Sequence, residues 1–381
     1  MDLLITGAAG FLGSHFLFEW LRQHPNDRAL CLVRGTQEES PWERVNQALA
    51  QAAYECDSDI GASDLLDRIT VIEADLNDMK WRNDPEFCDW ITRSEGFEVV
   101  HGAANLSFHE EDRSQIWYTN VTGTTNFFRT LKGVPSFRYF NYISTAYVAG
   151  NREGAILESQ DERPTSFNNV YEESKWAAEQ VVRDIAAKQG VGIRIFRPST
   201  IIGHSKTFRV SAKTGFYKVV EALRQVSRLR PAHTAAIEIP VKHGASLNLI
   251  PVDLVVLEMV DVIAAGAKSA GHVFHLTNER PVSLADLFFG ISPMTGVRLT
   301  CAAEVRSTAL DQMSALVISG LRHYLPYFQY ARTFERKNVH ACGAARHQQN
   351  YWLDLMRLRE FVRAFIEDET RDAAQVMKMG A

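Results

Sequence analysis

The sequence has few cysteines, and their arrangement does not point to a disulfide framework or a metal site. Its 381 residues include five cysteines, and none of them forms a C-x-x-C pair. Disulfide-rich secreted domains and structural zinc sites use cysteines in sets at characteristic spacings. We therefore expect reduced thiols in a cytoplasmic protein. The twelve histidines show no H-E-x-x-H pattern, so we expect no metal ligands.

Long apolar runs and basic clusters are also missing. The most apolar later run, residues 254–265, is short and contains Glu258 and Asp261, so it predicts a buried helix and not a membrane span. Lysines and arginines are scattered, and the formal net charge is −5. This balance argues against a nucleic-acid partner. Apolar residues recur at helical spacing in residues 351–366, which favours core packing, with weak contact to a membrane surface as the alternative.

The first half of the sequence alternates between strand and helix patterns. Short apolar runs predict strands at residues 3–6, 29–33, 69–73, 99–102, 139–144 and 192–196. Predicted helices follow at residues 14–23, 42–54, 120–131 and 170–188. Such alternation is typical of a parallel sheet with crossover helices. The sequence therefore predicts an α/β fold with a Rossmann-type, doubly wound parallel sheet.

The regular alternation weakens after Pro198, which suggests a second region. A helix is predicted at residues 216–228, and a strand at 272–276 indicates a return to the sheet. The remaining residues look mostly helical. We therefore expect an NADP-binding Rossmann domain made of residues 1–204 and 250–278. A smaller, mostly helical substrate-binding region would comprise residues 205–249 and 279–381.

A glycine-rich turn lies between the first predicted strand and the first predicted helix, where residues 6–13 read TGAAGFLG. Glycines in this position allow a tight turn and a close approach of the backbone to a pyrophosphate. The helix N-terminus then favours the negative charge. A purely structural turn is the alternative. The predicted cofactor-binding loop comprises Thr6, Gly7, Gly10, Phe11, Leu12 and Gly13.

The end of the second predicted strand carries Arg34 where an acidic residue would bind the ribose 2′-hydroxyl of NAD. A guanidinium suits a 2′-phosphate, to which it can donate two charged hydrogen bonds. We therefore expect NADP(H) as the cofactor. Arg44 could assist, although a solvated surface position is the alternative for either arginine. Asp75 and Leu76, after the third predicted strand, are placed to contact the adenine.

Tyr171 and Lys175 form a Tyr-x-x-x-Lys pair on a predicted helix. A spacing of four residues puts both side chains on one helical face. Free tyrosine has a pKa of about 10, and a nearby positive charge favours the phenolate and lowers that pKa. The pair therefore predicts a proton donor for chemistry at a carbonyl group.

Several stretches occur in the order seen in extended short-chain dehydrogenases. They are residues 6–13, HGAAN at 101–105, NVTGT at 120–124, YIST at 142–145, YEESK at 171–175 and RPS at 197–199. Four more resemble the fatty acyl-CoA reductase and thioester reductase branch, a male-sterility-type NAD(P)-binding family: CLVR at 31–34, NLSF at 105–108, LIPVD at 249–253 and FHLTN at 274–278. The resemblance covers residues 1 to about 290. The tail, with YLPY at 324–327, resembles the acyl reductases only loosely.

The resemblance implies roles for individual side chains. Thr145 matches the family's catalytic Ser/Thr, with Ser144 beside it. Tyr171 would be the catalytic acid and Lys175 its partner, and both would also contact the cofactor.

Further cofactor positions follow from the same resemblance. Ala103 and Ala104 would line the adenosine side. Pro198 and Ser199 would lie near the nicotinamide. Asn120 matches a helix position that supports the active-site backbone in related enzymes.

The implied activity is NADPH-dependent reduction of an acyl thioester to an aldehyde or alcohol. Thr145 and Tyr171 would donate hydrogen bonds to the developing oxyanion, and Lys175 would bind the nicotinamide ribose. The first predicted strand begins at residue 3, and we expect no carrier domain attached before it. We therefore expect an acyl-CoA or a separate acyl-carrier protein to present the thioester.

Three other functions remain open on the same fold, because a fold does not fix a function. A sugar-nucleotide epimerase or dehydratase is one, although Ala146 and Tyr147 stand where such a dehydratase would carry acidic residues. A reductase of free ketones or aldehydes is another. The third is an NADP-binding regulator without turnover, which would not need the intact Thr145, Tyr171 and Lys175.

Overall fold

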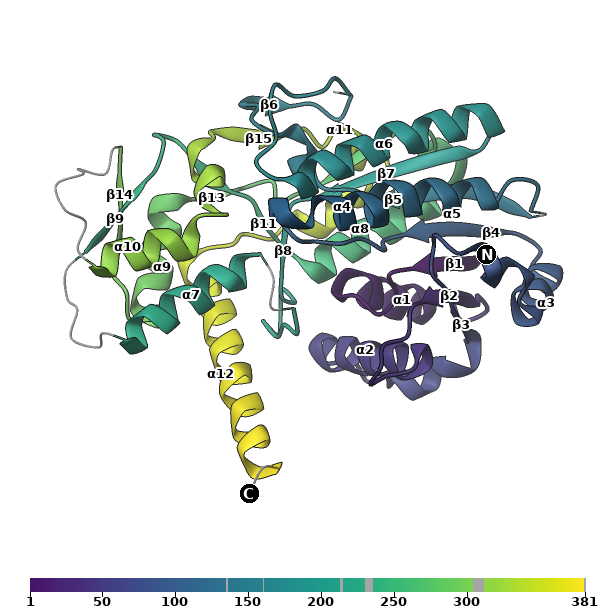
Figure 1. The fold of residues 1–381 in the computed structure, drawn as a ribbon, viewed down its shortest axis with the longest axis horizontal. Helices are drawn as coiled ribbons and strands as arrows, with labels where there is room; N and C mark the ends of the chain where they lie inside the picture. Colours follow the sequence, from purple (N-terminus) through teal and green to yellow (C-terminus); the bar gives the residue numbers. More distant parts are fainter. Residues whose placement is uncertain (135, 160, 213–214, 230–235, 304–311, 380–381) are drawn as a thin grey trace.

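A seven-stranded sheet forms the centre of the computed structural model, which describes residues 1–134, 136–159, 161–212, 215–229, 236–303 and 312–379 (Figure 1). All neighbouring strands are parallel, in the order β12-β7-β5-β4-β1-β2-β3. This order confirms the predicted Rossmann-type α/β fold. The strands are β1 (Asp2–Thr6), β2 (Ala29–Val33), β3 (Ile69–Glu73), β4 (Phe97–His101), β5 (Phe137–Ile143), β7 (Gly192–Pro198) and β12 (Val273–Leu276).

Helices cover both faces of the sheet because successive side chains of a strand point to opposite sides. Leu3 and Ile5 of β1 join the core beneath α1 and α8, whereas Leu4 packs with residues of α5 and α6. Figure 1 shows α4, α5 and α6 on one side and α1 and α2 on the other. The helices are α1 (Phe11–Gln23), α2 (Pro41–Cys56), α3 (Pro85–Arg93), α4 (Arg113–Trp117), α5 (Thr124–Thr130), α6 (Val170–Gln189) and α8 (Val252–Ala264).

The helix predicted at residues 120–131 begins earlier and is not regular. Helix α4 continues into a π-helical turn, Tyr118–Gly123, which leads into α5. Such turns widen a helix locally and are frequent at functional sites. Helix α3 has no counterpart among the predicted helices. The short 3-10 helices are Ala62–Arg68, Met79–Asn83, Glu110–Asp112, Ala146–Ala149, Gly266–Lys268, Leu325–Gln329 and Ala344–Gln348.

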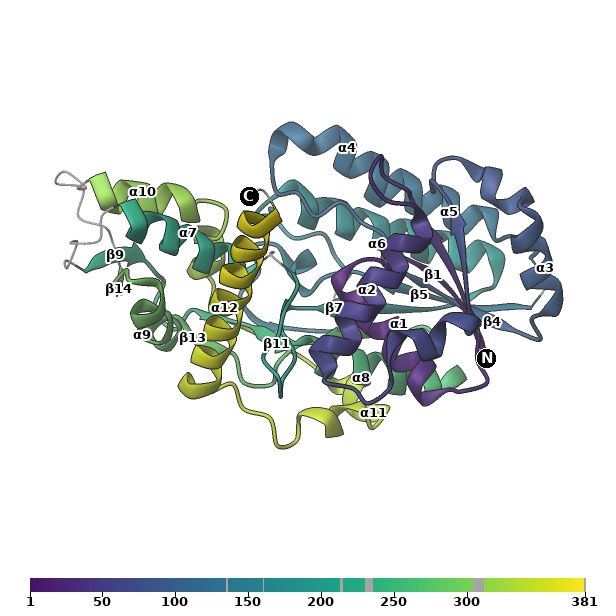
Figure 2. The ribbon, with the colours of Figure 1, turned by 90° about the horizontal axis from the view of Figure 1, so that it is seen from below.

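A second group of elements lies beside the sheet, as Figure 2 shows. It contains α7 (Phe216–Leu229), α9 (Leu284–Thr295), α10 (Gln312–Leu321) and α12 (Leu355–Met379). Their apolar faces build a separate core. Four short strand pairs lie outside the seven-stranded sheet: β6 (Gly154–Ile156) with β15 (Arg332–Phe334), β8 (Thr200–Ile202) with β11 (Leu249–Pro251), β9 (Ile237–Pro240) with β14 (Leu299–Ala302), and β10 (Ser246–Leu247) with β13 (Val282–Ser283).

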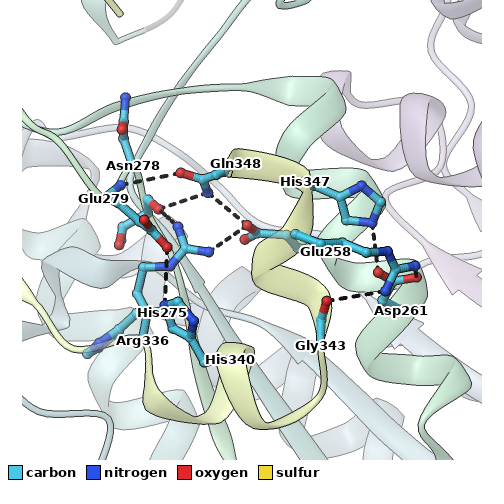
Figure 3. A network of polar contacts seen from close by, with 12 residues as sticks. Glu258, Asp261, His275, Asn278, Glu279, Arg336, His340, Gly343, His347 and Gln348 are labelled. Atoms are coloured by element: carbon cyan, nitrogen blue, oxygen red, sulfur yellow. Dashed lines mark hydrogen bonds and ion pairs between the residues drawn. The ribbon is translucent and has the colours of Figure 1, made fainter. Parts of the chain in front are cut away.

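The residues after β15 pack against the sheet domain, where buried hydrogen bonds and ion pairs hold them (Figure 3). This segment includes α11 (Lys337–Ala341). Arg336 donates to a carboxylate oxygen of Glu258 at 2.5 Å and to the carbonyl of Thr277. Gln348 donates to the same carboxylate at 2.8 Å. The predicted substrate-binding region of residues 279–381 therefore includes a stretch that packs against α8 and β12. The division into domains stays a prediction.

Glu158 is a second buried carboxylate at this junction. Its two oxygens accept from the backbone N–H groups of His275, at 3.0 Å, and Asn338, at 2.6 Å. It thereby joins the end of β6 to β12 and α11. Burial raises the pKa of the Glu158 carboxyl to about 7.

The raised pKa predicts a pH-dependent contribution of Glu158 to stability. An unfolded glutamate has a pKa of about 4.3. Between that pH and 7 the folded protein binds more protons than the unfolded chain, so this contribution falls as pH rises. We expect wild-type stability relative to Glu158→Gln to be greatest near pH 5 and to decline towards pH 8. Urea unfolding across this range measures it.

The exposed Glu38→Gln serves as the matched control and should leave the pH profile unchanged. A wild-type advantage over Glu158→Gln that is constant from pH 5 to pH 8 would contradict the assignment.

Candidate functional site

A cleft of about 980 Å³ runs along the carboxyl ends of the parallel strands. The loops after the strands meet at this edge because the strands share one direction. Of the site residues predicted from the sequence, Thr6 and Asn120 lie behind the cleft wall. The others line the cleft: Gly7, Gly10, Phe11, Leu12, Gly13, Arg34, Arg44, Asp75, Leu76, Ala103, Ala104, Ser144, Thr145, Tyr171, Lys175, Pro198 and Ser199.

The three glycines of the loop serve different purposes. Gly7 has φ +79°, and a Cβ there would lie 2.7 Å from the carbonyl carbon of Gly102. A Cβ on Gly13 would lie 2.1 Å from the Gly7 oxygen. Both positions therefore exclude a side chain for packing reasons. Gly10 is exposed at the start of α1, and no side chain caps this helix end. The first N–H groups of α1 thus remain available to an anion in the cleft.

A buried chain of hydrogen bonds holds the loop from below. Thr124 donates to the carbonyl of Asn120 at 2.7 Å, so its Oγ1 accepts from His101 Nε2 at 2.8 Å. His101 Nδ1 then accepts from Thr6 Oγ1 at 2.6 Å, and Thr6 accepts from the Ala103 N–H at 3.2 Å. Burial lowers the pKa of His101 to about 3. The neutral ring, protonated on Nε2, therefore links the glycine loop to the loop after β4.

Asn120 connects the π-helical turn to the helix that carries Tyr171. Its Oδ1 accepts from the Asn105 N–H at 2.7 Å, and its Nδ2 donates to the Asn105 carbonyl at 3.0 Å. The same Nδ2 donates to Ser174 Oγ at 2.9 Å, and Ser174 donates to the Tyr171 carbonyl at 2.8 Å. Asn120 is thus fully bonded and buried, and it fixes backbone on two sides of the cleft.

One end of the cleft presents positive charge. Arg34 is exposed at the end of β2, and the Arg44 side chain donates to its carbonyl. Asp75 follows β3, and its carboxylate accepts from the Asn77 N–H at 2.9 Å. Both arginines line the cleft together with Asp75 and Leu76. An anionic group placed at this end would meet the Arg34 guanidinium.

The middle of the cleft contains Thr145, Tyr171 and Lys175. Tyr171 lies in the first turn of α6, which begins at the N-cap Asn169. The Lys175 ammonium donates to the Ile143 carbonyl at 2.6 Å and lies 4.2 Å from the centre of the Tyr142 ring. Thr145 caps the 3-10 helix after β5, because its Oγ1 accepts from the Tyr147 N–H at 3.3 Å. Three elements distant in sequence therefore meet here.

The pKa of Tyr171 differs from the prediction. Burial and the neighbouring Glu172 raise it, whereas the sequence predicted a lowering by Lys175. The prediction was wrong because it considered the nearby charge and not the loss of water around the phenol. Burial also lowers the pKa of Lys175 to about 7. Tyr171 therefore keeps its proton at neutral pH and can donate it.

Further lining residues were not predicted from the sequence. Phe108 and Tyr147 stand beside Tyr171, and Lys218, His323 and Tyr324 come from the second group of elements. NLSF at residues 105–108 and YLPY at 324–327 were visible signals, but neither indicated which side chains would face the cleft. Lys218 and His323 stand outside any motif.

Metal and membrane features are absent from the part of the chain that the structure describes. No group of three histidine, cysteine, aspartate or glutamate side chains there could hold a metal ion. None of the described helices combines the length and apolar composition that a membrane crossing requires.

Known proteins similar to this chain share its family and its fold. A family model described as "Male sterility protein" matches residues 5–259. The nonribosomal peptide synthetase asaC of Aspergillus flavus is 28% identical over 302 residues, covering 75% of this chain and 27% of that protein. A carboxylic acid reductase of Mycobacterium marinum is 23% identical over 296 residues, covering 72% of this chain and 24% of that protein. The chain spans about a quarter of the length of these relatives.

Solved structures show the same fold over nearly the whole chain. The terminal R domain from the myxalamid PKS-NRPS biosynthetic pathway has a TM-score of 0.75 and 23% identity, covering 97% of this chain and 91% of that one. A thiolation-reductase di-domain from an archaeal non-ribosomal peptide synthetase has a TM-score of 0.72 and 18% identity, covering 97% of this chain and 76% of that one.

The loop geometry predicts that Gly13→Ala weakens dinucleotide binding. The new Cβ would lie 2.1 Å from the Gly7 oxygen, so the backbone of the glycine loop would have to shift. We expect the Kd for a reduced nicotinamide dinucleotide, measured by fluorescence titration, to rise at least ~10-fold, about 1.4 kcal/mol. Gly61→Ala is the matched control, since it lies outside the cleft and its Cβ would come no nearer than 3.3 Å to another atom, the Ser63 Oγ. A folded Gly13→Ala protein with unchanged affinity would contradict this account.

Proposed function

We propose, from the premise that this chain belongs to the male sterility protein family, that it reduces acyl thioesters with NADPH. The observation that carries the proposal is the meeting of Thr145, Tyr171 and Lys175 in a cleft that begins at the glycine loop. A carbonyl held there faces a protonated phenol. The similarity to a carboxylic acid reductase supports reduction at the carboxyl oxidation level.

The residues of the cleft fit a nicotinamide dinucleotide. The uncapped start of α1 and the exposed Gly10 would hold the pyrophosphate. Asp75, Leu76, Ala103 and Ala104 would surround the adenosine. The bound cofactor supplies the hydride.

Arg34 supports NADP over NAD. It occupies the end of β2, where a dinucleotide-binding domain specific for NAD carries an acidic residue. Its guanidinium is exposed and able to pair with a 2′-phosphate, and Arg44 holds the backbone at the same position. We assign Arg34 the main contact with that phosphate.

The side chains act on the thioester oxygen. Thr145 and Tyr171 donate hydrogen bonds to the oxygen as it becomes an anion, which stabilises the transition state. Tyr171 then transfers its proton to that oxygen and gives a neutral hemithioacetal. Cleavage of the C–S bond releases a thiol, which takes up the hydroxyl proton, and leaves an aldehyde. Lys175, which donates to the Ile143 carbonyl, would position the nicotinamide ribose.

The partner that presents the acyl group is proposed to be a carrier domain. A thiolation-reductase di-domain shares the fold, and a peptide synthetase is among the relatives. An acyl-CoA remains a second source of the same thioester chemistry. Both carry the acyl group on a pantetheine arm, so acyl-pantetheine is a suitable probe.

Tyr171→Phe tests the catalytic assignment. We expect kcat for NADPH oxidation with acyl-CoA or acyl-pantetheine thioesters to fall by ~10²–10³, because one oxyanion donor and the proton are lost. The Kd for NADPH should stay within about twofold, a difference of ~0.4 kcal/mol. Thiol release must match NADPH loss.

Tyr54→Phe, an exposed position on α2, is the matched control and should keep full activity. Near-normal turnover in Tyr171→Phe would contradict the assignment of Tyr171 as the proton donor. Turnover of sugar nucleotides or free ketones, and of no thioester, would overturn the proposed reaction.

Arg34→Ser tests the cofactor preference. Loss of the guanidinium should raise KM for NADPH ~10–100-fold, as expected for a charged hydrogen-bonding contact of about 1.5–3 kcal/mol, and leave KM for NADH nearly unchanged. Steady-state kinetics with both cofactors measure the effect. Arg82→Ser, another exposed arginine outside the cleft, should leave both values unchanged. An equal increase for NADPH and NADH would exclude a 2′-phosphate contact.

A further inference from the structure

A small apolar recess opens from the cleft beside Tyr171. Its volume is about 70 Å³. Phe108, Tyr147, Tyr171 and Thr200 line both the cleft and the recess, so the two spaces are continuous. The inner end is formed by Phe216, Val219, Leu247, Leu287, Tyr327 and Phe328.

Three of the polar side chains in this wall form hydrogen bonds with other side chains. The Tyr147 hydroxyl and Thr200 Oγ1 are 2.9 Å apart and hydrogen bonded. The Tyr327 hydroxyl donates to Glu172 Oε1 at 2.6 Å and accepts from Asn169 Nδ2 at 2.9 Å. A polar or charged group inside the recess would therefore lose its water without gaining a partner from these three side chains.

Packing and hydrogen bonds on the side away from the recess hold the aromatic residues of its wall in place. Glu172 is buried beside Tyr171 and also accepts from the Asn168 N–H at 2.9 Å. Tyr327 packs edge-to-face on Tyr147 with ring centres 5.0 Å apart. Because these rings are fixed by both packing and hydrogen bonds, the recess cannot widen at the Tyr327 side without breaking the Glu172 contacts.

We infer that this recess receives the acyl group and restricts the substrate to short, uncharged aliphatic thioesters. The inference rests on the proposed reduction of thioesters. An apolar cavity of ~150 Å³ holds benzene, and the recess has about half that volume. It therefore suits an alkyl group of roughly two to four carbons and excludes a phenyl ring or a long chain.

The position of Tyr171 orients such a substrate. With the acyl group in the recess, the carbonyl lies at the shared wall, where Tyr171 is. The sulfur arm then extends into the open part of the cleft, which is lined by Lys218, Gln225 and His323. The acyl group and its carrier arm thus occupy different spaces, the small apolar recess and the larger cleft.

Chain-length profiles of kcat/KM test the inference with S-acyl-pantetheines from acetyl to dodecanoyl, together with phenylacetyl and succinyl thioesters. Wild type should prefer acyl groups near four carbons and disfavour the phenylacetyl and succinyl compounds. Leu287→Ala enlarges the inner end and should move the optimum to longer chains, with a gain of about fourfold in kcat/KM per added methylene that fits. Leu284→Ala is the matched control, since Leu284 is buried on the same helix outside the recess.

Val219→Phe provides the opposite change, because it fills the inner end. It should keep activity with acetyl-pantetheine and lose activity with butanoyl-pantetheine, and thermal unfolding checks that the variant is folded. A wild-type preference for dodecanoyl or phenylacetyl thioesters, or identical profiles in Leu287→Ala and Leu284→Ala, would overturn the recess assignment. Absence of NADPH oxidation with every thioester would instead refute the proposed function.

Discussion

The parallel alignment of the central strands is the constraint on which the cleft depends. A buried polar bridge crosses three of them: Arg194 of β7 donates to Glu98 of β4 at 2.8 Å and to Asn141 of β5 at 2.9 Å. Charges removed from water are tolerated only when they are fully paired, so this bridge favours one register of the three strands. That register brings Thr145, after β5, and Pro198, at the end of β7, to the same edge of the sheet.

The second constraint is the return of the C-terminal residues to the sheet domain. Arg336 and Gln348 both bind Glu258, and Glu158 binds the start of α11. The segment just before them carries Tyr327, which closes the recess beside Tyr171. These buried contacts therefore limit how far the second group of elements can move relative to α6. Under the proposed function, a change that weakens these contacts would also change the size of the recess.

The sequence predicted features that depend on a local motif, and it did not predict properties that depend on burial. The glycine spacing predicted the loop. In the structure, Gly7 and Gly13 are required because a side chain at either position would clash with backbone atoms, whereas Gly10 is exposed to the cleft. The Tyr-x-x-x-Lys spacing predicted that Tyr171 and Lys175 share one helical face. It did not predict the raised pKa of Tyr171, because the loss of water and the proximity of Glu172 follow from tertiary packing. The π-helical turn around Asn120 also had no sequence signal.

By itself, the sequence determined the strands of the parallel sheet, the glycine loop, the arginine at the end of β2 and the chemical groups of Thr145, Tyr171 and Lys175. Each of these depends on residues close together in the chain, where spacing and side-chain chemistry are sufficient evidence. Only the tertiary structure decided the recess, since Phe108, Tyr171, Leu287 and Tyr327 come from four distant segments. Its volume and its mostly apolar wall result from side-chain packing between distant segments, which no local pattern encodes.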